Sequence, residues 1–280
     1  MQNFRPGGFS LLPPVVKNLL IINGLFFLAT LAFGNAFNLD LVRILGLHFP
    51  GADNFAPYQF VSYMFMHGGF THLFFNMFAL WMFGNMLESV WGPKRFLIYY
   101  LITGFGAAIL HYAVIYWQMA PTLREINMLI ENPTHQSLEA FFHSEYFKIT
   151  SIEIQNNFRL FLIDYNSLIN TAPNEALVTA VNFLNQYRID FLNAPVVVGA
   201  SGAVFGILLA FGMLFPNSII YLFFAIPIKA KYFVMLYGAV ELYFGIAGRP
   251  DSNIAHFAHL GGMIFGFFLI RYWKSKGRMY

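Results

Sequence analysis

Long hydrophobic runs separated by short polar stretches dominate the chain. A helix that crosses a bilayer needs about 20 mainly apolar residues. The chain has six runs of roughly that kind, at 15–33, 60–86, 96–117, 196–215, 232–247 and 254–273. The pattern therefore predicts an all-α polytopic membrane protein, built as a bundle of six transmembrane helices.

Two further stretches contain apolar residues but lack the length or the uninterrupted apolar run that a transmembrane span needs. Residues 34–59 mix apolar and polar groups, so we expect a structured interfacial loop there. Residues 219–228 are apolar but short and end at Lys229. This stretch is expected to form an interfacial or re-entrant connection between the fourth and fifth spans.

Residues 118–194 differ from the rest of the chain. They have no long apolar run, and they hold eight of the 13 acidic residues: Glu125, Glu131, Glu139, Glu145, Glu153, Asp164, Glu175 and Asp190. Leu177, Val181 and Leu184 recur at helical spacing after a start signal at Thr171 to Asn174. We expect residues 1–280 to form one membrane domain that carries residues 118–194 as a helical extramembrane insertion on the outer face. Its apolar content predicts that it packs on itself or lies on the bilayer.

Composition agrees with a membrane protein. Hydrophobic residues make up 58% of the chain and charged residues 10%, with a mean hydropathy of +0.58. Soluble domains are about 45–50% apolar and about 25% charged. The chain has no cysteine, which excludes disulfides and thiolate chemistry. A net charge of +3 is too small to indicate nucleic-acid binding.

The positive charges predict the orientation of the helices. With the N-terminus inside, the inner side collects Arg5, Lys17, Lys94, Arg95, Lys229, Lys231, Arg271, Lys274, Lys276 and Arg278. The outer side keeps Arg43, Arg124, Lys148, Arg159, Arg188 and Arg249. The positive-inside rule places both termini in the cytoplasm. The absence of a targeting extension favours a bacterial plasma (inner) membrane.

A serine and a histidine among small residues are the first candidates for chemistry. Ser201 lies in Gly199-Ala200-Ser201-Gly202-Ala203, and His259 lies in Ala258-His259-Leu260-Gly261-Gly262. A neutral histidine can act as the general base that a serine nucleophile requires. Small-residue faces on the fourth span (Gly202, Gly206) and the sixth (Ala258, Gly262, Gly266) would let the two backbones approach.

Residues near Ser201 and His259 are candidates for supporting roles. Phe205 lies one turn after Ser201, where its ring could pack against the imidazole. Asp251 is expected in a loop, so no acidic third member is evident and a Ser–His dyad is predicted. A helix that starts at Pro195 would place Ser201 roughly 9 Å below the outer boundary, within reach of water.

Two polar residues of the second span are candidate oxyanion donors. His72 and Asn76 are spaced i, i+4 and share one helical face. Acyl transfer needs hydrogen-bond donors where negative charge develops. Together with the backbone N–H of Ser201, these side chains are expected to form the oxyanion hole. With both termini in the cytoplasm, His72, Asn76, Ser201 and His259 all fall in the outer half of the membrane.

Other interpretations of the polar residues are structural or metal-binding. A serine among glycines can serve helix packing, and His111 can be a polar packing group. The pairs His67/His72 and His256/His259 could ligate a metal or haem, but carboxylate and thiolate partners are not evident, so neither a metal nor a cofactor is expected. Glu241 is either a structural carboxylate or part of a gate. Because only Glu241 lies well inside a span, a transporter or proton channel is disfavoured.

These motifs resemble the rhomboid intramembrane serine proteases. The resemblance rests on Gly199-Ala200-Ser201-Gly202, on His259-x-x-Gly262-x-x-x-Gly266, and on His67-x4-His72-x3-Asn76 with Glu88 before the Gly92 turn. It implies that Ser201 is the nucleophile, His259 the base, His72 and Asn76 the oxyanion donors, and His67 a structural residue. It also implies cleavage of transmembrane protein substrates near the outer membrane boundary.

The chain departs from the family pattern in two places. An aromatic–arginine pair in the first outer loop is replaced by Tyr58-Gln59, and the usually short third connection is replaced by residues 118–194. We hypothesise that this insertion screens or recruits substrates. A catalytically silent relative that only binds transmembrane helices is the alternative, although such a protein is expected to lose the serine or the histidine. The sequence predicts neither the substrate nor the oligomeric state.

Overall fold

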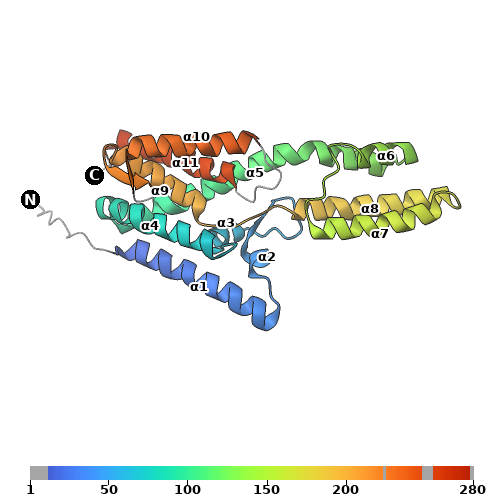
Figure 1. Ribbon diagram of the computed structural model, residues 1–280, viewed down its shortest axis with the longest axis horizontal. Coiled ribbons are helices and arrows are strands. Elements are labelled where there is room, and N and C mark those ends of the chain that lie inside the picture. The colour runs from blue at the N-terminus through green and yellow to red at the C-terminus, as the bar shows by residue number, and fades with distance from the viewer. Residues whose placement is uncertain (1–11, 223–224, 248–254, 278–280) are drawn as a thin grey trace, which may run out of the picture. The chain divides into compact units, whose positions relative to one another are not determined.

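The computed structural model describes residues 12–222, 225–247 and 255–277 (Figure 1). The chain forms two compact units. The first contains the described residues within 1–47, 57–112 and 197–280, and the second contains residues 48–56 and 113–196. The expected tail at residues 1–14 and Asp251 lie wholly or largely outside the described residues.

Six helices among the described residues correspond to the six predicted spans. They are α1 (Pro14–Phe37), α4 (Phe70–Trp91), α5 (Pro93–Glu131), α9 (Ser201–Leu214), α10 (Ala230–Ala247) and α11 (His256–Ser275). Within the first unit, α1 packs on α4, and α9 packs against α4, α10 and α11. Among the described residues, α1, α4 and α5 are long and apolar enough to cross a membrane on their own, and α9 is a shorter apolar helix. The predicted helical membrane bundle is confirmed.

A glutamate from another helix caps α1. Pro14 occupies the first turn, where a missing N–H costs nothing. The next two N–H groups, of Val15 and Val16, donate to the two carboxylate oxygens of Glu88 on α4, at 2.9 and 2.8 Å. A buried carboxylate at a helix N-terminus is stabilised by these donors and by the helix dipole. Glu88 therefore joins α1 to α4.

The second span begins later than the predicted residue 60. Residues 59–65 form a short helix, α3 (Gln59–Ser62), followed by a 3₁₀ turn, η1 (Tyr63–Phe65). The helix α4 begins only at Phe70, after Gly68 and Gly69. Paired glycines disfavour helix because their backbone freedom is lost on ordering. His67 consequently precedes α4 instead of lying in its first turns.

The first loop is structured without spanning, as predicted. It contains α2 (Leu41–Leu45) and β1 (Leu47–His48), and Asp40 caps α2 through the N–H groups of Val42 and Arg43. Tyr58 Oη and Gln59 Nε2 both donate to the carbonyl of Ile44, at 3.0 and 3.1 Å. The glutamine that departs from the family pattern thus fastens α3 to the end of α2.

The helix α5 continues past the predicted end of the third span at residue 117. It passes through Pro121 and ends at Glu131. A proline inside a helix removes one backbone hydrogen bond, and its ring crowds the carbonyl one turn earlier, so packing must hold the helix together there. Ile126 and Leu129 provide such packing, because they are buried in the core of the second unit.

The second unit has a hydrophobic core of its own. It contains the end of α5 together with α6 (His135–Phe142), α7 (Ile152–Leu168) and α8 (Pro173–Asn193). The rings of Phe161 and Phe183 stack with centroids 4.4 Å apart, beside Leu184, which is fully buried. The Tyr187 hydroxyl receives a hydrogen bond from the N–H of Lys148 and donates to its carbonyl. Burial raises the pKa of Tyr187 to about 12, so this hydroxyl stays neutral and can do both.

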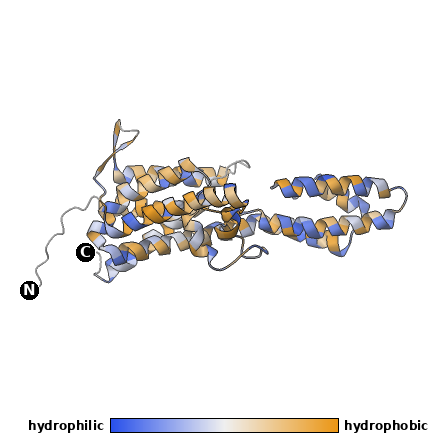
Figure 2. Cartoon of the chain, turned by 90° about the horizontal axis from the view of Figure 1, so that it is seen from below, coloured by the Kyte–Doolittle hydropathy of each residue, from blue (hydrophilic) through white to orange (hydrophobic). Residues whose placement is uncertain are grey.

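The distribution of hydropathy differs between the units. Figure 2 shows hydrophobic residues predominating along the helices of the first unit, whereas hydrophilic and hydrophobic residues alternate along α6 to α8. An alternating pattern is typical of helices that bury one face and expose the other. The predicted helical insertion is therefore a folded helical unit that packs on itself.

The chain enters α9 differently from the prediction. Val196–Val197 form the strand β2, which pairs with β1, and the helix begins at Ser201. Gly199 has φ +119°, which interrupts any helix from Pro195. The expected depth of 9 Å assumed helical rise over residues 195–201, so that depth does not apply.

The connection between α9 and α10 is a β-hairpin. The strands β3 (Ile219–Leu222) and β4 (Ile226–Lys229) pair antiparallel, with Ile219 opposite Lys229 and Ile220 opposite Ile228. Alternating exposure along β3 fits a two-stranded ribbon. The predicted interfacial or re-entrant stretch is thus a hairpin.

Candidate active site

Ser201 and His259 meet at the beginnings of two helices. Ser201 is the first residue of α9, and His259 lies in the first turn of α11. His259 Nε2 lies 2.9 Å from Ser201 Oγ, and His259 is only 8% exposed. This is hydrogen-bond distance. The two residues that the sequence singled out, 58 positions apart, are therefore in direct contact.

Glycines make this contact possible. A Cβ on Gly262 would overlap the carbonyl of Gly202, so α9 and α11 touch backbone to backbone at this point. Gly206 and Gly266 lie on the same helices but face α5, Gly206 against Thr103 and Gly266 against Tyr99 and Thr103. The predicted small-residue faces thus serve two interfaces, one between α9 and α11 and one with α5.

An aromatic ring covers the imidazole. The rings of Phe205 and His259 are parallel within 4°, with centroids 4.1 Å apart. The predicted contact is present, as the spacing of one helical turn from Ser201 indicated. Tyr237 of α10 also packs on Phe205, with ring centroids 5.0 Å apart. Phe205 is thus itself packed where it covers the imidazole.

A carboxylate completes the cluster, and the sequence interpretation did not find it. Oε2 of Glu241, on α10, lies 2.9 Å from Nδ1 of His259 and 2.6 Å from Nδ1 of His256. Glu241 is 5% exposed. The expectation that no carboxylate partners the His256/His259 pair is wrong. The sequence does show Glu241 as the one acidic residue well inside a span, and the need of a buried carboxylate for a partner is the signal that could have linked it to these histidines.

His72 lies beside the turn that carries Ser201. A Cβ on Gly199 would come within 2.7 Å of Cε1 and Nε2 of His72, and Gly199 also needs its positive φ. The N–H of Gly199 donates to the carbonyl of Tyr63 at 2.9 Å, which anchors this turn. Only glycine fits here, and it brings the imidazole of His72 within two residues of the serine.

Asn76 and His67 lie around His72. The side chain of Asn76 is buried, and its Nδ2 donates to the carbonyl of His72 at 3.0 Å, within α4. The rings of His67 and His72 meet edge to face, with centroids 5.0 Å apart. His72 is therefore next to the Ser201 turn, whereas the Asn76 amide is directed to its own helix.

Glu241, His256 and His259 each have one side-chain atom that could bind a metal ion. These three atoms lie within 4.8 Å of one another. Two ligands about 2.0 Å from a tetrahedral zinc ion stand roughly 3.3 Å apart. The 2.6 and 2.9 Å separations at Glu241 Oε2 are shorter and fit hydrogen bonds.

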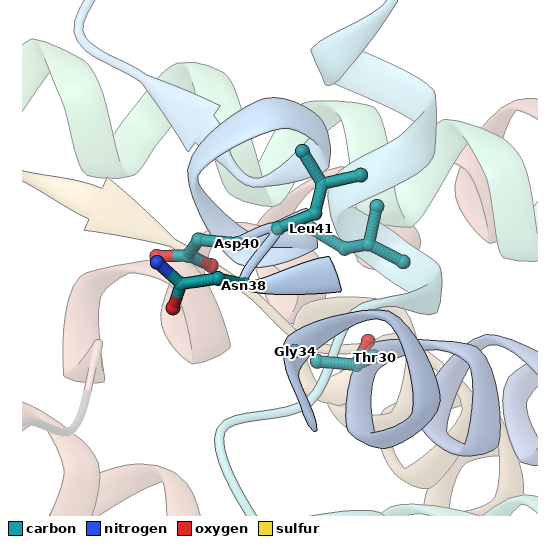
Figure 3. Close-up of a pocket in the computed structure, with 6 residues that line it drawn as sticks. Thr30, Gly34, Asn38, Asp40 and Leu41 are labelled. Carbon is teal, nitrogen blue, oxygen red and sulfur yellow. The ribbon is translucent and has the colours of Figure 1, made fainter. Parts of the chain in front are cut away.

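A pocket elsewhere in the first unit has no part in this cluster. Figure 3 shows it between the end of α1 and the start of α2, lined by Thr30, Gly34, Asn38, Leu39, Asp40 and Leu41. The Asp40 carboxylate there accepts the capping hydrogen bonds of α2. This pocket contains none of the residues described above.

The fold and the cluster define a helical membrane protein with a hydrogen-bonded serine and histidine on adjoining helices. The sequence model described as "Rhomboid domain" matches residues 54–120 and 170–275, more than half of the chain. The chain belongs to the rhomboid family. The gap between the matched ranges falls in the second unit.

Two relatives, both from Arabidopsis thaliana, agree with this assignment. The chain is 32% identical over 99 residues to "Rhomboid-like protein 11, chloroplastic" and 42% identical over 53 residues to "RHOMBOID-like protein 6, mitochondrial". These matches cover 33% and 19% of this chain, and 34% and 17% of the relatives. The chain thus spans about a third or less of the relatives it matches. The names of these relatives refer to chloroplasts and mitochondria, so they do not support the predicted bacterial plasma membrane.

Proposed function

We propose that this protein is an intramembrane serine endopeptidase that cleaves transmembrane protein substrates near the outer membrane boundary. The observation that carries the proposal is the 2.9 Å contact between Ser201 Oγ and His259 Nε2. A serine hydroxyl is a weak nucleophile until a base within hydrogen-bond reach removes its proton. Family membership supports the same assignment.

Acylation follows from this contact. As Ser201 Oγ attacks the carbonyl carbon of the scissile peptide bond, its proton passes to Nε2 of His259. The C–N bond then breaks, and the imidazolium returns the proton to the leaving amine. A water molecule, deprotonated by the same nitrogen, hydrolyses the acyl-enzyme and regenerates Ser201.

Donors for the oxyanion are proposed at the start of α9 and on α4. N–H groups in the first turn of a helix have no intrahelical acceptor, so the N–H of Ser201 is available. His72 lies against Gly199 and can offer a ring N–H to the same space. Asn76 would contribute the amide hydrogen that it does not give to the His72 carbonyl. Loss of one such donor costs roughly 3–4 kcal/mol of transition-state stabilisation.

The proposed substrates are membrane-spanning segments that can unwind. A peptide bond in a helix is shielded, and its backbone groups need new partners when the helix opens in lipid. Small or helix-destabilising residues near the outer boundary would lower that barrier. In the proposed orientation both termini are cytoplasmic, because basic residues concentrate on that side.

The test is cleavage of a single-span substrate by the purified protein in detergent. Wild type should cut, whereas Ser201→Ala and His259→Ala should each lose at least about 10³-fold in kcat. Ser275→Ala is a suitable control, because that hydroxyl donates to the carbonyl of Tyr272 at the end of α11. A folded wild type that neither cuts nor reacts with a fluorophosphonate would favour a silent relative that binds transmembrane helices.

A further inference from the structure

Glu241 gives the Ser201–His259 pair an acidic partner. We propose that Glu241 is a positioning residue for the proposed proteolysis, so that Ser201, His259 and Glu241 form a chain of hydrogen bonds. The inference rests on the proposed function and deepens it. It is carried by two contacts of one imidazole: Nε2 lies 2.9 Å from Ser201 Oγ, and Nδ1 lies 2.9 Å from Glu241 Oε2.

The carboxylate determines which nitrogen of His259 is the base. A neutral imidazole has one N–H and one lone pair, and the hydrogen bond made by one nitrogen decides the state of the other. A carboxylate oxygen accepts and does not donate when ionised, so the proton of His259 belongs on Nδ1. The lone pair is then on Nε2, where it faces the hydroxyl of Ser201.

The same carboxylate stabilises the charge that forms during the reaction. When Nε2 takes the serine proton, His259 becomes a cation in a site that is mostly shielded from water. An anion in contact with Nδ1 offsets that charge, and the effect is larger in a buried site than in water. The Phe205 stack holds the ring plane, while Glu241 fixes the rotation within that plane.

His256 holds the carboxylate in place. Its Nδ1 lies 2.6 Å from the oxygen that faces His259, so Oε2 accepts from both rings. A carboxylate in an apolar helix is costly unless it is paired. The two histidines supply those partners from one helical face of α11, three residues apart. His256 is thus a support for Glu241 and does not touch Ser201.

The experiment compares two buried carboxylates that receive the same substitution. Glu241→Gln keeps the shape of the side chain, but its amide can donate to Nδ1 and leave the proton on Nε2, the wrong nitrogen. Glu88→Gln is the matched control: Glu88 is 2% exposed and accepts two hydrogen bonds far along α4 from His72. Both variants are made in the full chain, with Glu241→Asp and His256→Gln beside them.

Two rates are measured on protein shown to be folded by its thermal transition. One is kcat for a single-span substrate, and the other is the rate at which a fluorophosphonate labels Ser201, which needs no peptide substrate. We expect Glu241→Gln to lower both by about 10²–10⁴-fold with KM nearly unchanged. Glu241→Asp should recover part of the loss, and His256→Gln should lose less than about tenfold because the Glu241–His259 contact remains.

The outcomes separate this inference from the proposed function. If wild type reacts and Glu241→Gln reacts within about threefold of it, the positioning role is wrong and the Ser201–His259 proposal stands. Equal losses in Glu88→Gln and Glu241→Gln would also overturn the role, because they would reflect packing alone. Loss of labelling in EDTA would overturn it in favour of a bound metal. Failure of the folded wild type to cut or label removes both proposals.

Discussion

The Phe205 ring lies parallel to the His259 imidazole, with centroids 4.1 Å apart and 4° between the planes. Both residues sit on rigid helices, so the stack restricts the imidazole to the plane in which Nε2 reaches Ser201. The position of Phe205 one turn after the serine on α9 makes it a direct link between the two helices.

Replacing that ring should slow the chemistry more than it disturbs the fold. Phe205→Leu keeps an apolar side chain but loses the stack, which is worth about 0.5–1.5 kcal/mol. The labelling rate of Ser201 should fall roughly three- to tenfold. Phe211→Leu is the control, since Phe211 is as buried on the same helix and packs on Phe83 instead. Equal effects of the two substitutions on labelling would contradict this role.

The contact between α9 and α11 should be intolerant of a single methyl group. Gly262→Ala would place Cβ on the carbonyl of Gly202, so the helices must separate and Ser201 must leave His259. We expect loss of at least about 100-fold in labelling, because small misplacements in an active site have that effect. Gly24→Ala on α1 meets no atom within 4 Å and should be neutral or slightly stabilising. A fully active Gly262→Ala protein would show that the contact is not needed.

The cap of α1 makes a prediction about stability alone. Glu88→Gln removes the charge from two hydrogen bonds at the helix N-terminus, and such charge-assisted bonds contribute about 1.5–3 kcal/mol each. The thermal transition in detergent should shift down by several degrees. Glu131→Gln, at an exposed carboxylate at the end of α5, should change stability by less than about 0.5 kcal/mol. Identical transitions for the two variants would contradict the capping role.

The insertion can be destabilised by a substitution in its own hydrophobic core, with the residues around Ser201 left unchanged. Phe183→Ala removes a ring that stacks on Phe161 and should destabilise the second unit by about 3–5 kcal/mol. Limited proteolysis should then cut α6 to α8 faster, whereas Ile163→Ala, at a side chain 63% exposed, should behave as wild type. If the insertion screens or recruits substrates, Phe183→Ala should change the relative cleavage of two substrates while labelling of Ser201 stays constant. Unchanged substrate preference would remove that hypothesis.

Local patterns predicted much of this molecule. Long apolar runs predicted the six helices of the membrane bundle, and the helical spacing of Leu177, Val181 and Leu184 predicted α8. Glycines beside Ser201 and His259 predicted the close approach of their helices. In each case the determinant lies within one turn or one face of a helix, which periodicity reports directly.

The misplaced elements depend on contacts distant in sequence. The start of α9 at Ser201 follows from Gly199, which has a positive φ, leaves no room for a Cβ beside His72 and donates a hydrogen bond to Tyr63. The continuation of α5 past Pro121 follows from Ile126 packing into the second unit. Glu241 was visible as a carboxylate in an apolar span, but its partners are 15 and 18 residues away on another helix. Only the packing of α10 on α11 reveals that contact.

The reactivity of Ser201 shows whether His259 activates it as a nucleophile. Purified wild type, Ser201→Ala and His259→Ala proteins are treated with a fluorophosphonate, and the adduct is located by peptide mapping while its rate of formation is followed. We expect a single adduct on Ser201 in wild type, none in Ser201→Ala, and a rate at least about 100-fold lower in His259→Ala. An adduct that forms equally fast without the histidine, or no adduct in the folded wild type, would contradict this activation.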